Sequence, residues 1–157
     1  MGKSHEYKAA LVWTGNRGEG TATYQAYGRE YRVTIMGKPE LTGSANAMFR
    51  GDPARHDPED LFLTAISSCH MLSYLALCAR RGINVIAYED DASGTLVLDG
   101  DGGRFSEVTL RPKVTISSGD LERAKELHHR AHEECFIANS CSVPIRCEPT
   151  VVTKVDG

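Results

Sequence analysis

The sequence lacks the features that mark several common protein classes. Its 157 residues contain no Cys-x-x-Cys pair, which argues against a thioredoxin-like redox motif and a zinc ribbon. The opening stretch "MGKSHEYKAALVWTG" has no apolar core long enough for a signal peptide, and Glu6 stands where myristoylation requires Ser or Thr. Internal repeats and low-complexity segments are absent as well. We therefore expect a single domain over residues 1–157, located in the cytoplasm.

The sequence also lacks a strong excess of either positive or negative charge. Eighteen basic residues against twenty-one acidic ones give a net charge of −3, and the charges are scattered along the chain. This pattern gives no reason to expect a nucleic-acid or membrane partner. Hydrophobic residues make up 41% and charged residues 25%, which is the balance of an ordinary soluble globular protein.

Five cysteines are present, at positions 69, 78, 135, 141 and 147. Their odd number and wide spacing argue against an extracellular disulfide framework. In a reducing cytoplasm a thiol matters for its reactivity more than for cross-linking.

The order of the expected elements is βββ-α-βββ-α-β, which predicts an α+β fold with antiparallel sheets. The first strands are expected in "YKAALVWTG", "TATYQAY" and "EYRVTIMG", followed by the loop "KPELTGSANAMFRGDPARH". A long helix spans residues 57–82. Two or three strands follow in "INVIAYEDDASGTLVLDG" and "RFSEVTLRPKVTIS", then a second helix from about 118–120 to Cys135, and a closing strand in "VPIRCEPTVVTKV".

The long helix has clear signals at both ends. Asp57 is a plausible N-cap, Pro58 suits the first helical position, and Gly82 follows Arg80 and Arg81 as a stop. Because polar residues interrupt the helix, we interpret it as a buried helix of a soluble protein. It is apolar on nearly every face, so one small chain would hardly enclose it. We therefore expect an intertwined homodimer with the long helices paired at its centre.

The thiols are the main candidates for chemistry. Cys69 lies at the centre of the long helix, whereas Cys135 ends the second helix and Cys141 follows it. A peroxide-reactive thiol and a resolving thiol in this arrangement would form a sulfenic acid and then a disulfide. Cys78 and Cys147 are expected to be small core residues.

The motifs "RGEGT", "DPEDLFLTAISSC" and "AHEECFIANS", in this order, resemble the OsmC and organic-hydroperoxide-resistance (Ohr) family, here its broader OsmC-like branch. The resemblance implies an intertwined α+β homodimer that reduces organic hydroperoxides with a dihydrolipoyl-type dithiol as reductant. It also implies an active site of Cys69 as nucleophile, Cys135 as resolving thiol, Arg17 and Glu59, with no metal, flavin or haem. Cys141 remains an alternative to Cys135.

Two other functions fit the same residues. One is a non-catalytic OsmC-like protein that binds a small apolar ligand or acts as a stress protein. The other is a metal protein, because His128, His132 and Cys135 have the helical spacing i, i+4 and i+7, although this segment is more typical of a solvated helix face.

The spacing of Glu59 and Cys69 adds a constraint on the active site. Ten residues on one helix correspond to about 15 Å along its axis, too far for Glu59 to support chemistry at Cys69 of the same chain. In an antiparallel pair of long helices, Glu59 of one chain would instead approach Cys69 of the other.

Overall fold

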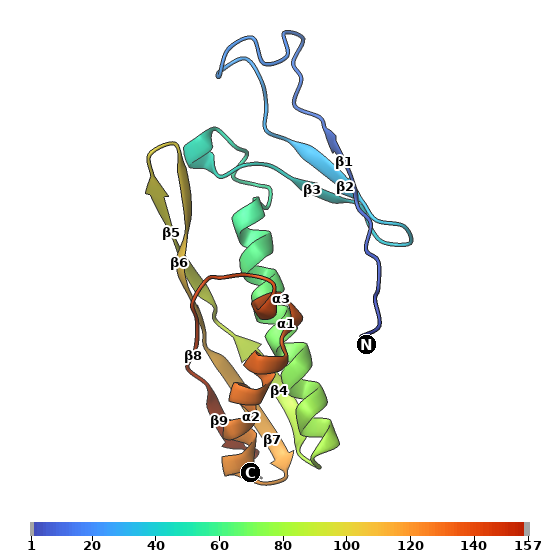
Figure 1. The fold of residues 1–157 in the computed structure, drawn as a ribbon, viewed down its shortest axis with the longest axis vertical. Helices are drawn as coiled ribbons and strands as arrows, with labels where there is room; N and C mark the ends of the chain where they lie inside the picture. Colours follow the sequence, from blue (N-terminus) through green and yellow to red (C-terminus); the bar gives the residue numbers. More distant parts are fainter. Residues whose placement is uncertain (1, 156–157) are drawn as a thin grey trace. The chain divides into compact units, whose positions relative to one another are not determined.

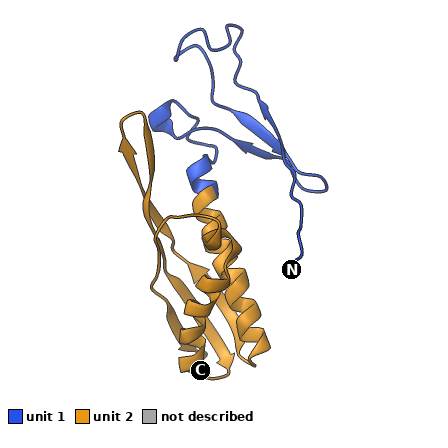
Figure 2. Cartoon of the chain, in the orientation of Figure 1, with its two compact units in different colours: residues 1–61 blue, residues 62–157 orange. Residues whose placement is uncertain are grey.

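The structure is a computed structural model that describes residues 2–155, and its chain divides into two compact units (Figures 1 and 2). The first unit ends at Leu61 and the second begins at Phe62. Both α-helices and β-sheets are present, as the predicted α+β class requires. The single domain over residues 1–157 stays a prediction, because the division into units does not test it.

The first unit contains a three-stranded antiparallel sheet of β1 (Ala10–Trp13), β2 (Tyr31–Thr34) and β3 (Leu41–Gly43). A short 3-10 helix, Ala47–Phe49, follows and is capped by the side chain of Asn46. β3 lies within the stretch that the sequence predicted as a loop.

The predicted strand "TATYQAY", residues 21–27, is wrong, because these residues form turns and bends. The guanidinium group of Arg29 explains the difference. It donates hydrogen bonds to the carbonyl oxygens of Tyr24, at 2.7 Å, and Tyr27, and it lies over both aromatic rings at 4.4 and 3.8 Å from their centroids. These local contacts occupy backbone carbonyls that a strand would use in its ladder.

The long helix α1 runs from Pro58 to Arg80, as its end signals predicted. Asp57 caps it, since its Oδ1 accepts a hydrogen bond from the backbone N–H of Asp60 at 2.8 Å. The carboxylate of Asp60 accepts the backbone N–H of Asp57 at 3.3 Å, which completes a reciprocal capping pair. After the helix, Gly82 takes a left-handed conformation with φ +69° that favours glycine.

The second unit has two three-stranded sheets. One has the order β4 (Asn84–Asp90), β7 (Pro112–Ser118), β9 (Thr150–Thr153), and the other β5 (Ser93–Asp99), β6 (Gly102–Leu110), β8 (Ile145–Cys147). The predicted closing strand is thus two short strands, one in each sheet. The prediction of antiparallel sheets is wrong for these two pairs, since β8 runs parallel to β6 and β9 parallel to β7. Each pair is joined through helices, which can return the chain in the same direction.

Helix α2 (Leu121–Glu134) follows β7 and ends one residue before Cys135. Asp120 caps it by accepting the backbone N–H of Arg123 at 3.1 Å. Its buried stripe comprises Ala124, Leu127, His128 and Ala131, and a short helix α3 (Phe136–Asn139) comes next. The predicted second helix is therefore confirmed, and α3 is an element that the sequence did not reveal.

The hydrophobic core of the second unit has two clusters. The larger one joins α1, α2, β7 and β9 through Tyr74, Leu77, Cys78, Ile83, Val114, Ile116, Ala124, Leu127, Ala131 and Val151. The smaller one centres on Ile66, Val108 and Leu110, with Phe62 stacked on Phe105 at a centroid distance of 5.1 Å.

One side of α1 is bonded to the rest of the second unit. Ser67 donates a hydrogen bond of 2.6 Å to Asp90 of β4, and the Tyr74 hydroxyl donates one of 2.8 Å to the carbonyl oxygen of Ala124 in α2. The helix is long and apolar enough to cross a membrane by length and composition, a test that core helices of soluble proteins also pass. Its apolar side is incompletely covered within one chain, since Leu72 is 62% exposed.

Two tyrosines with buried hydroxyl groups allow a test of how α1 is held. Tyr74→Phe removes the hydrogen bond to Ala124, so we expect the free energy of unfolding to fall by about 1 kcal/mol. The hydroxyl of Tyr88 is buried but has no hydrogen-bond partner in the described part of the chain, so Tyr88→Phe should leave stability unchanged or raise it. Denaturation in urea measures both variants. Equal losses in the two would contradict the assignment of the Tyr74 bond.

Candidate functional site

Two cysteines far apart in the sequence meet in the second unit. Cys69 lies near the middle of α1 and is half-buried, whereas Cys135 follows α2 and is 1% exposed. The side chain of Cys69 is close enough to the Cys135 thiol to influence its pKa. Burial raises the pKa of Cys135, and the neighbouring Cys69 side chain raises it further. Cys135 is therefore held in the thiol form beside Cys69.

The backbone around Cys135 explains how its thiol is held. The residue leaves the helical conformation, with φ −68° and ψ 115°, and thereby separates α2 from α3. Its sulfur accepts the backbone N–H of Ala138 at 3.5 Å. The Cys135 thiol is thus held at the junction of α2 and α3, with Cys69 as a neighbouring side chain.

The other cysteines differ in surroundings. Cys78 is buried in the larger core cluster, as expected, and burial raises its pKa. Cys141 is half-buried, and its sulfur lies 3.7 Å from the carbonyl oxygen of Ala138. The structure thus brings Cys135, the first of the two predicted resolving thiols, to Cys69.

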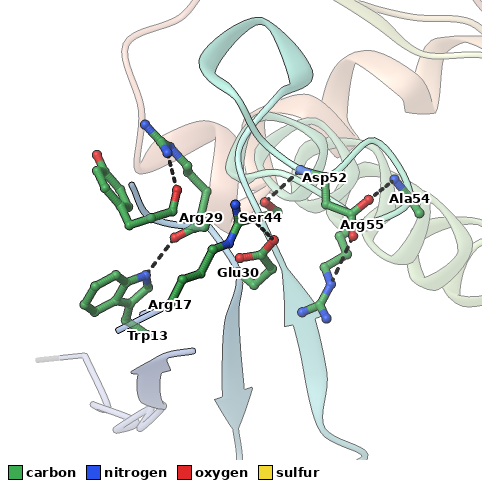
Figure 3. A network of polar contacts seen from close by, with 10 residues as sticks. Trp13, Arg17, Arg29, Glu30, Ser44, Asp52, Ala54 and Arg55 are labelled. Carbon is green, nitrogen blue, oxygen red and sulfur yellow. Dashed lines mark hydrogen bonds and ion pairs between the residues drawn. The ribbon is translucent and has the colours of Figure 1, made fainter. Parts of the chain in front are cut away.

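Arg17 belongs to the first unit, in the glycine-containing turn after β1. Its guanidinium nitrogen lies 3.8 Å from the carboxylate of Glu30, and its side chain is 64% exposed (Figure 3). A Cβ at Gly28 would lie 1.9 Å from a Glu30 carboxylate oxygen and 3.1 Å from the arginine, so a larger residue there would displace the Glu30 carboxylate from its present position. The carbonyl oxygen of Gly28 also accepts the indole N–H of Trp13 at 2.9 Å.

Glu59 lies in the first turn of α1, within the first unit. It lines a cavity of about 260 Å³ together with Arg29, Tyr31, Ser44 and Phe49, among others. The pKa of Tyr31 is raised by burial and by the nearby carboxylates of Asp57 and Glu59. Among residues 2–155, the ion pair of Arg17 is with Glu30, and none joins it to Glu59.

A second polar group escaped the sequence reasoning. His70 Nε2 lies 3.0 Å from His128 Nδ1 and 3.8 Å from the sulfur of Cys147, so residues of α1, α2 and β8 meet. Burial lowers the pKa of His70 to about 4 and that of His128 to about 3, so both are neutral at pH 7. Burial, followed by Asp90 and Glu148, raises the pKa of Cys147 to about 12. No sequence motif joins positions 70, 128 and 147, because the three residues belong to three separate elements.

The metal-ligand set predicted from helical spacing, His128, His132 and Cys135, is not the set of side chains that the structure brings together. His128 is 2% exposed and contacts His70, so the expectation of a solvated face is wrong at this residue. Cys135 lies beyond the end of α2 in an extended backbone conformation and neighbours Cys69, so it does not continue the helical face of His128 and His132. Among the described residues, the group close enough to share one metal ion is His70, His128 and Cys147.

Comparison with known proteins places these features in context. The family model described as OsmC-like protein matches residues 51–149. An OsmC-like protein of unknown function from Vibrio cholerae is 32% identical and superposes with a TM-score of 0.82, covering 94% of this chain and 100% of that one. The comparison with curated proteins gives no match.

Two further solved structures have lower identity and share the fold. An organic hydroperoxide resistance protein from Elizabethkingia anophelis is 17% identical, with a TM-score of 0.66 and coverage of 98% and 100%. The organic hydroperoxide resistance protein OhrB of Bacillus subtilis is 20% identical, with a TM-score of 0.59 and coverage of 92% and 98%.

The contact between the thiols predicts which disulfide forms. Treatment with diamide, a general thiol oxidant, should join Cys69 to Cys135 in preference to any other pair, because the two side chains are neighbours in the second unit. Peptide mapping by mass spectrometry identifies the product, and Cys69→Ser should prevent it. A map in which Cys135 is joined to Cys141 and Cys69 remains reduced would contradict the prediction.

Proposed function

Because the chain belongs to the OsmC-like family, we propose that it is a thiol-dependent peroxidase that reduces organic hydroperoxides. The observation that carries the proposal is the contact between Cys69 and Cys135. Two neighbouring thiols on different elements are what a peroxidatic and resolving pair requires. The substrate class follows the printed names of two structural neighbours, which are organic hydroperoxide resistance proteins.

The exposures of the two thiols assign their roles. Cys69 is half-buried and Cys135 is 1% exposed, so a peroxide reaches Cys69 more readily. The raised pKa of Cys135 keeps that residue in the thiol form, which is a poor nucleophile. We therefore assign the attack on the peroxide to Cys69 and the resolving step to Cys135.

The reaction balances with these two thiols and one external dithiol. The thiolate of Cys69 attacks the terminal oxygen of ROOH, the O–O bond breaks, and the alkoxide takes a proton and leaves as the alcohol ROH. Cys69 is then a sulfenic acid, and the sulfur of Cys135 displaces its hydroxyl as water to form a disulfide. A dihydrolipoyl-type dithiol reduces this disulfide by thiol–disulfide exchange.

Arg17 is proposed to orient the peroxide and to hold the thiolate through its planar, permanently charged guanidinium group. Its present partner, Glu30, is 3.8 Å away, and its side chain is largely exposed, so it has freedom to pair with another carboxylate. Glu59 is proposed to be that carboxylate in the active site, where a bidentate pair would fix the arginine.

A homodimer is part of the same proposal. Glu59 and Cys69 lie ten residues apart on α1, about 15 Å along the helix axis. The incompletely covered side of α1, with Leu72 62% exposed, is a surface that a second α1 would bury. Antiparallel pairing of two such helices about a two-fold axis would bring Glu59 of each chain toward Cys69 of the other.

Removal of Cys69 tests the activity itself. With a dihydrolipoyl dithiol and tert-butyl hydroperoxide, the unaltered protein should consume peroxide, and Cys69→Ser should lower kcat/KM at least about a thousandfold, as loss of a nucleophile does. Cys135→Ser should allow one turnover and then accumulate sulfenic acid at Cys69.

Cys78→Ser is the matched control, because Cys78 is buried on the same helix but lies in the hydrophobic core. Its peroxide turnover should remain close to that of the unaltered protein at a temperature where it is folded. If the unaltered protein with dithiol consumes no peroxide, a non-catalytic ligand-binding role replaces the enzyme.

Mixing of subunits tests whether Glu59 acts across a dimer. Glu59→Ala and Cys69→Ser proteins should each be inactive, and exchange of their subunits should restore about half of the activity per heterodimer, because one of the two sites is then intact. Native mass spectrometry counts the heterodimers while a peroxide assay follows turnover. Verified heterodimers without activity would mean that Glu59 acts within its own chain.

A further inference from the structure

The second unit contains a cluster of metal-ligand side chains that the peroxidase reaction does not use. His70 comes from α1, His128 from α2 and Cys147 from β8. One ligand atom of each lies within 4.8 Å of the others. Three separate elements thus converge on one point of the interior.

The distances between these atoms fit a metal site. In a tetrahedral zinc site, metal–ligand bonds of about 2.0–2.1 Å to nitrogen and 2.3 Å to sulfur place two nitrogens about 3.3 Å apart and a nitrogen and a sulfur about 3.6 Å apart. The structure has 3.0 Å between His70 Nε2 and His128 Nδ1 and 3.8 Å between His70 Nε2 and Cys147 Sγ. These two separations differ from the tetrahedral values by a few tenths of an ångström, and the third pair, His128 and Cys147, lies within 4.8 Å.

The histidine pair is not explained by stability. Both rings are buried, at 1% and 2% exposure, and His128 Nε2 has no hydrogen-bond partner in the described part of the chain. A buried polar atom without a partner destabilises the fold, so apolar residues of similar volume would serve a purely structural role better. The nitrogens available to a metal ion are the two that face each other, His70 Nε2 and His128 Nδ1, because one N–H···N bond is all they exchange for it.

The rings are nevertheless held in place. His70 and His128 are nearly parallel, at 7°, and Tyr74 stacks on His128 at a centroid distance of 3.9 Å and an angle of 10°. The Tyr74 hydroxyl is itself fixed by Ala124. Restrained imidazole rings are what a metal site requires of its ligands.

A path from solvent reaches the cluster. A cavity of about 280 Å³ is lined by His128 and Cys147 together with Lys125, His129, His132 and Pro149. Three protein ligands leave a fourth position in a tetrahedral site, and this cavity offers room for a water molecule or a further donor there.

From this arrangement we propose that His70, His128 and Cys147 bind a zinc ion, with the fourth position open to the cavity beside His132. The two imidazoles coordinate as neutral ligands, and Cys147 coordinates as a thiolate whose proton is released to solvent. Zinc is the cation best matched to two imidazoles and one thiolate in a non-redox site. The ion would clamp α1, α2 and β8 together at the residue that follows Cys69.

Metal titration of the whole chain tests the proposal. After treatment with EDTA, the protein should bind one zinc ion per chain in competition with a chromophoric chelator. Cobalt(II), a spectroscopic substitute for zinc, should give the ligand-field bands of a tetrahedral site and a sulfur-to-cobalt charge-transfer band. Cys147→Ser should abolish that band and weaken zinc binding at least tenfold, and His128→Asn should weaken binding similarly.

Cys141→Ser and His129→Asn are the matched controls, because Cys141 is a half-buried thiol outside the cluster and the His129 side chain is 82% exposed on α2. Both should bind zinc as the unaltered chain does. Loss of the charge-transfer band in Cys69→Ser with retention in Cys147→Ser would overturn the proposal, as would an absence of stoichiometric binding.

A measurement on the unaltered chain covers the case in which the variants do not fold. Zinc should slow the alkylation of Cys147 by iodoacetamide and leave that of Cys141 unchanged, as mass spectrometry of the peptides can show. Protection of Cys69 and Cys135 without protection of Cys147 would overturn the site. None of these readouts depends on peroxide turnover, so the proposed peroxidase activity and the zinc site can fail separately.

Discussion

The contact between α1 and α2 is the interaction on which the chemistry of this chain depends. Tyr74 bonds to Ala124, and His70, one helical turn earlier in α1, meets His128, one turn later in α2. With this register the two helices run antiparallel. Because the register is fixed by hydrogen bonds and not by apolar contact alone, the position of the neighbouring Cys69 is fixed as well.

The same contact explains why two different polar centres lie so close together. Cys69 and His70 are consecutive residues of α1, and about 100° of helical rotation separates them. Cys69 therefore lies beside Cys135 at the end of α2, and His70 contacts His128 within α2. Neighbouring residues of α1 can thus contact different partners, because α2 and the segment after it cover adjoining parts of the helix surface.

The sequence predicted the helices well because their ends carry local signals. Asp57 and Asp120 cap α1 and α2 through contacts within one turn, and Gly82 takes the left-handed conformation that its position after Arg80 implied. The sheets were predicted less well, because their pairing depends on distant residues. The turns at residues 21–27 depend on Arg29, and the parallel strands depend on the path of the chain through α2 and α3.

The thiol pair and the imidazole cluster differ in how far the sequence reveals them. Three separated motifs carry the resemblance that implies Cys69 and Cys135, and the structure brings these two thiols together. His70, His128 and Cys147 belong to three elements, and helical periodicity favoured His132 and Cys135 as partners of His128 instead. Periodicity describes one element at a time, so it finds a helix face but not a point where three elements meet. A buried cluster of this kind follows only from tertiary packing, because the register of α1 against α2 brings His70 to His128.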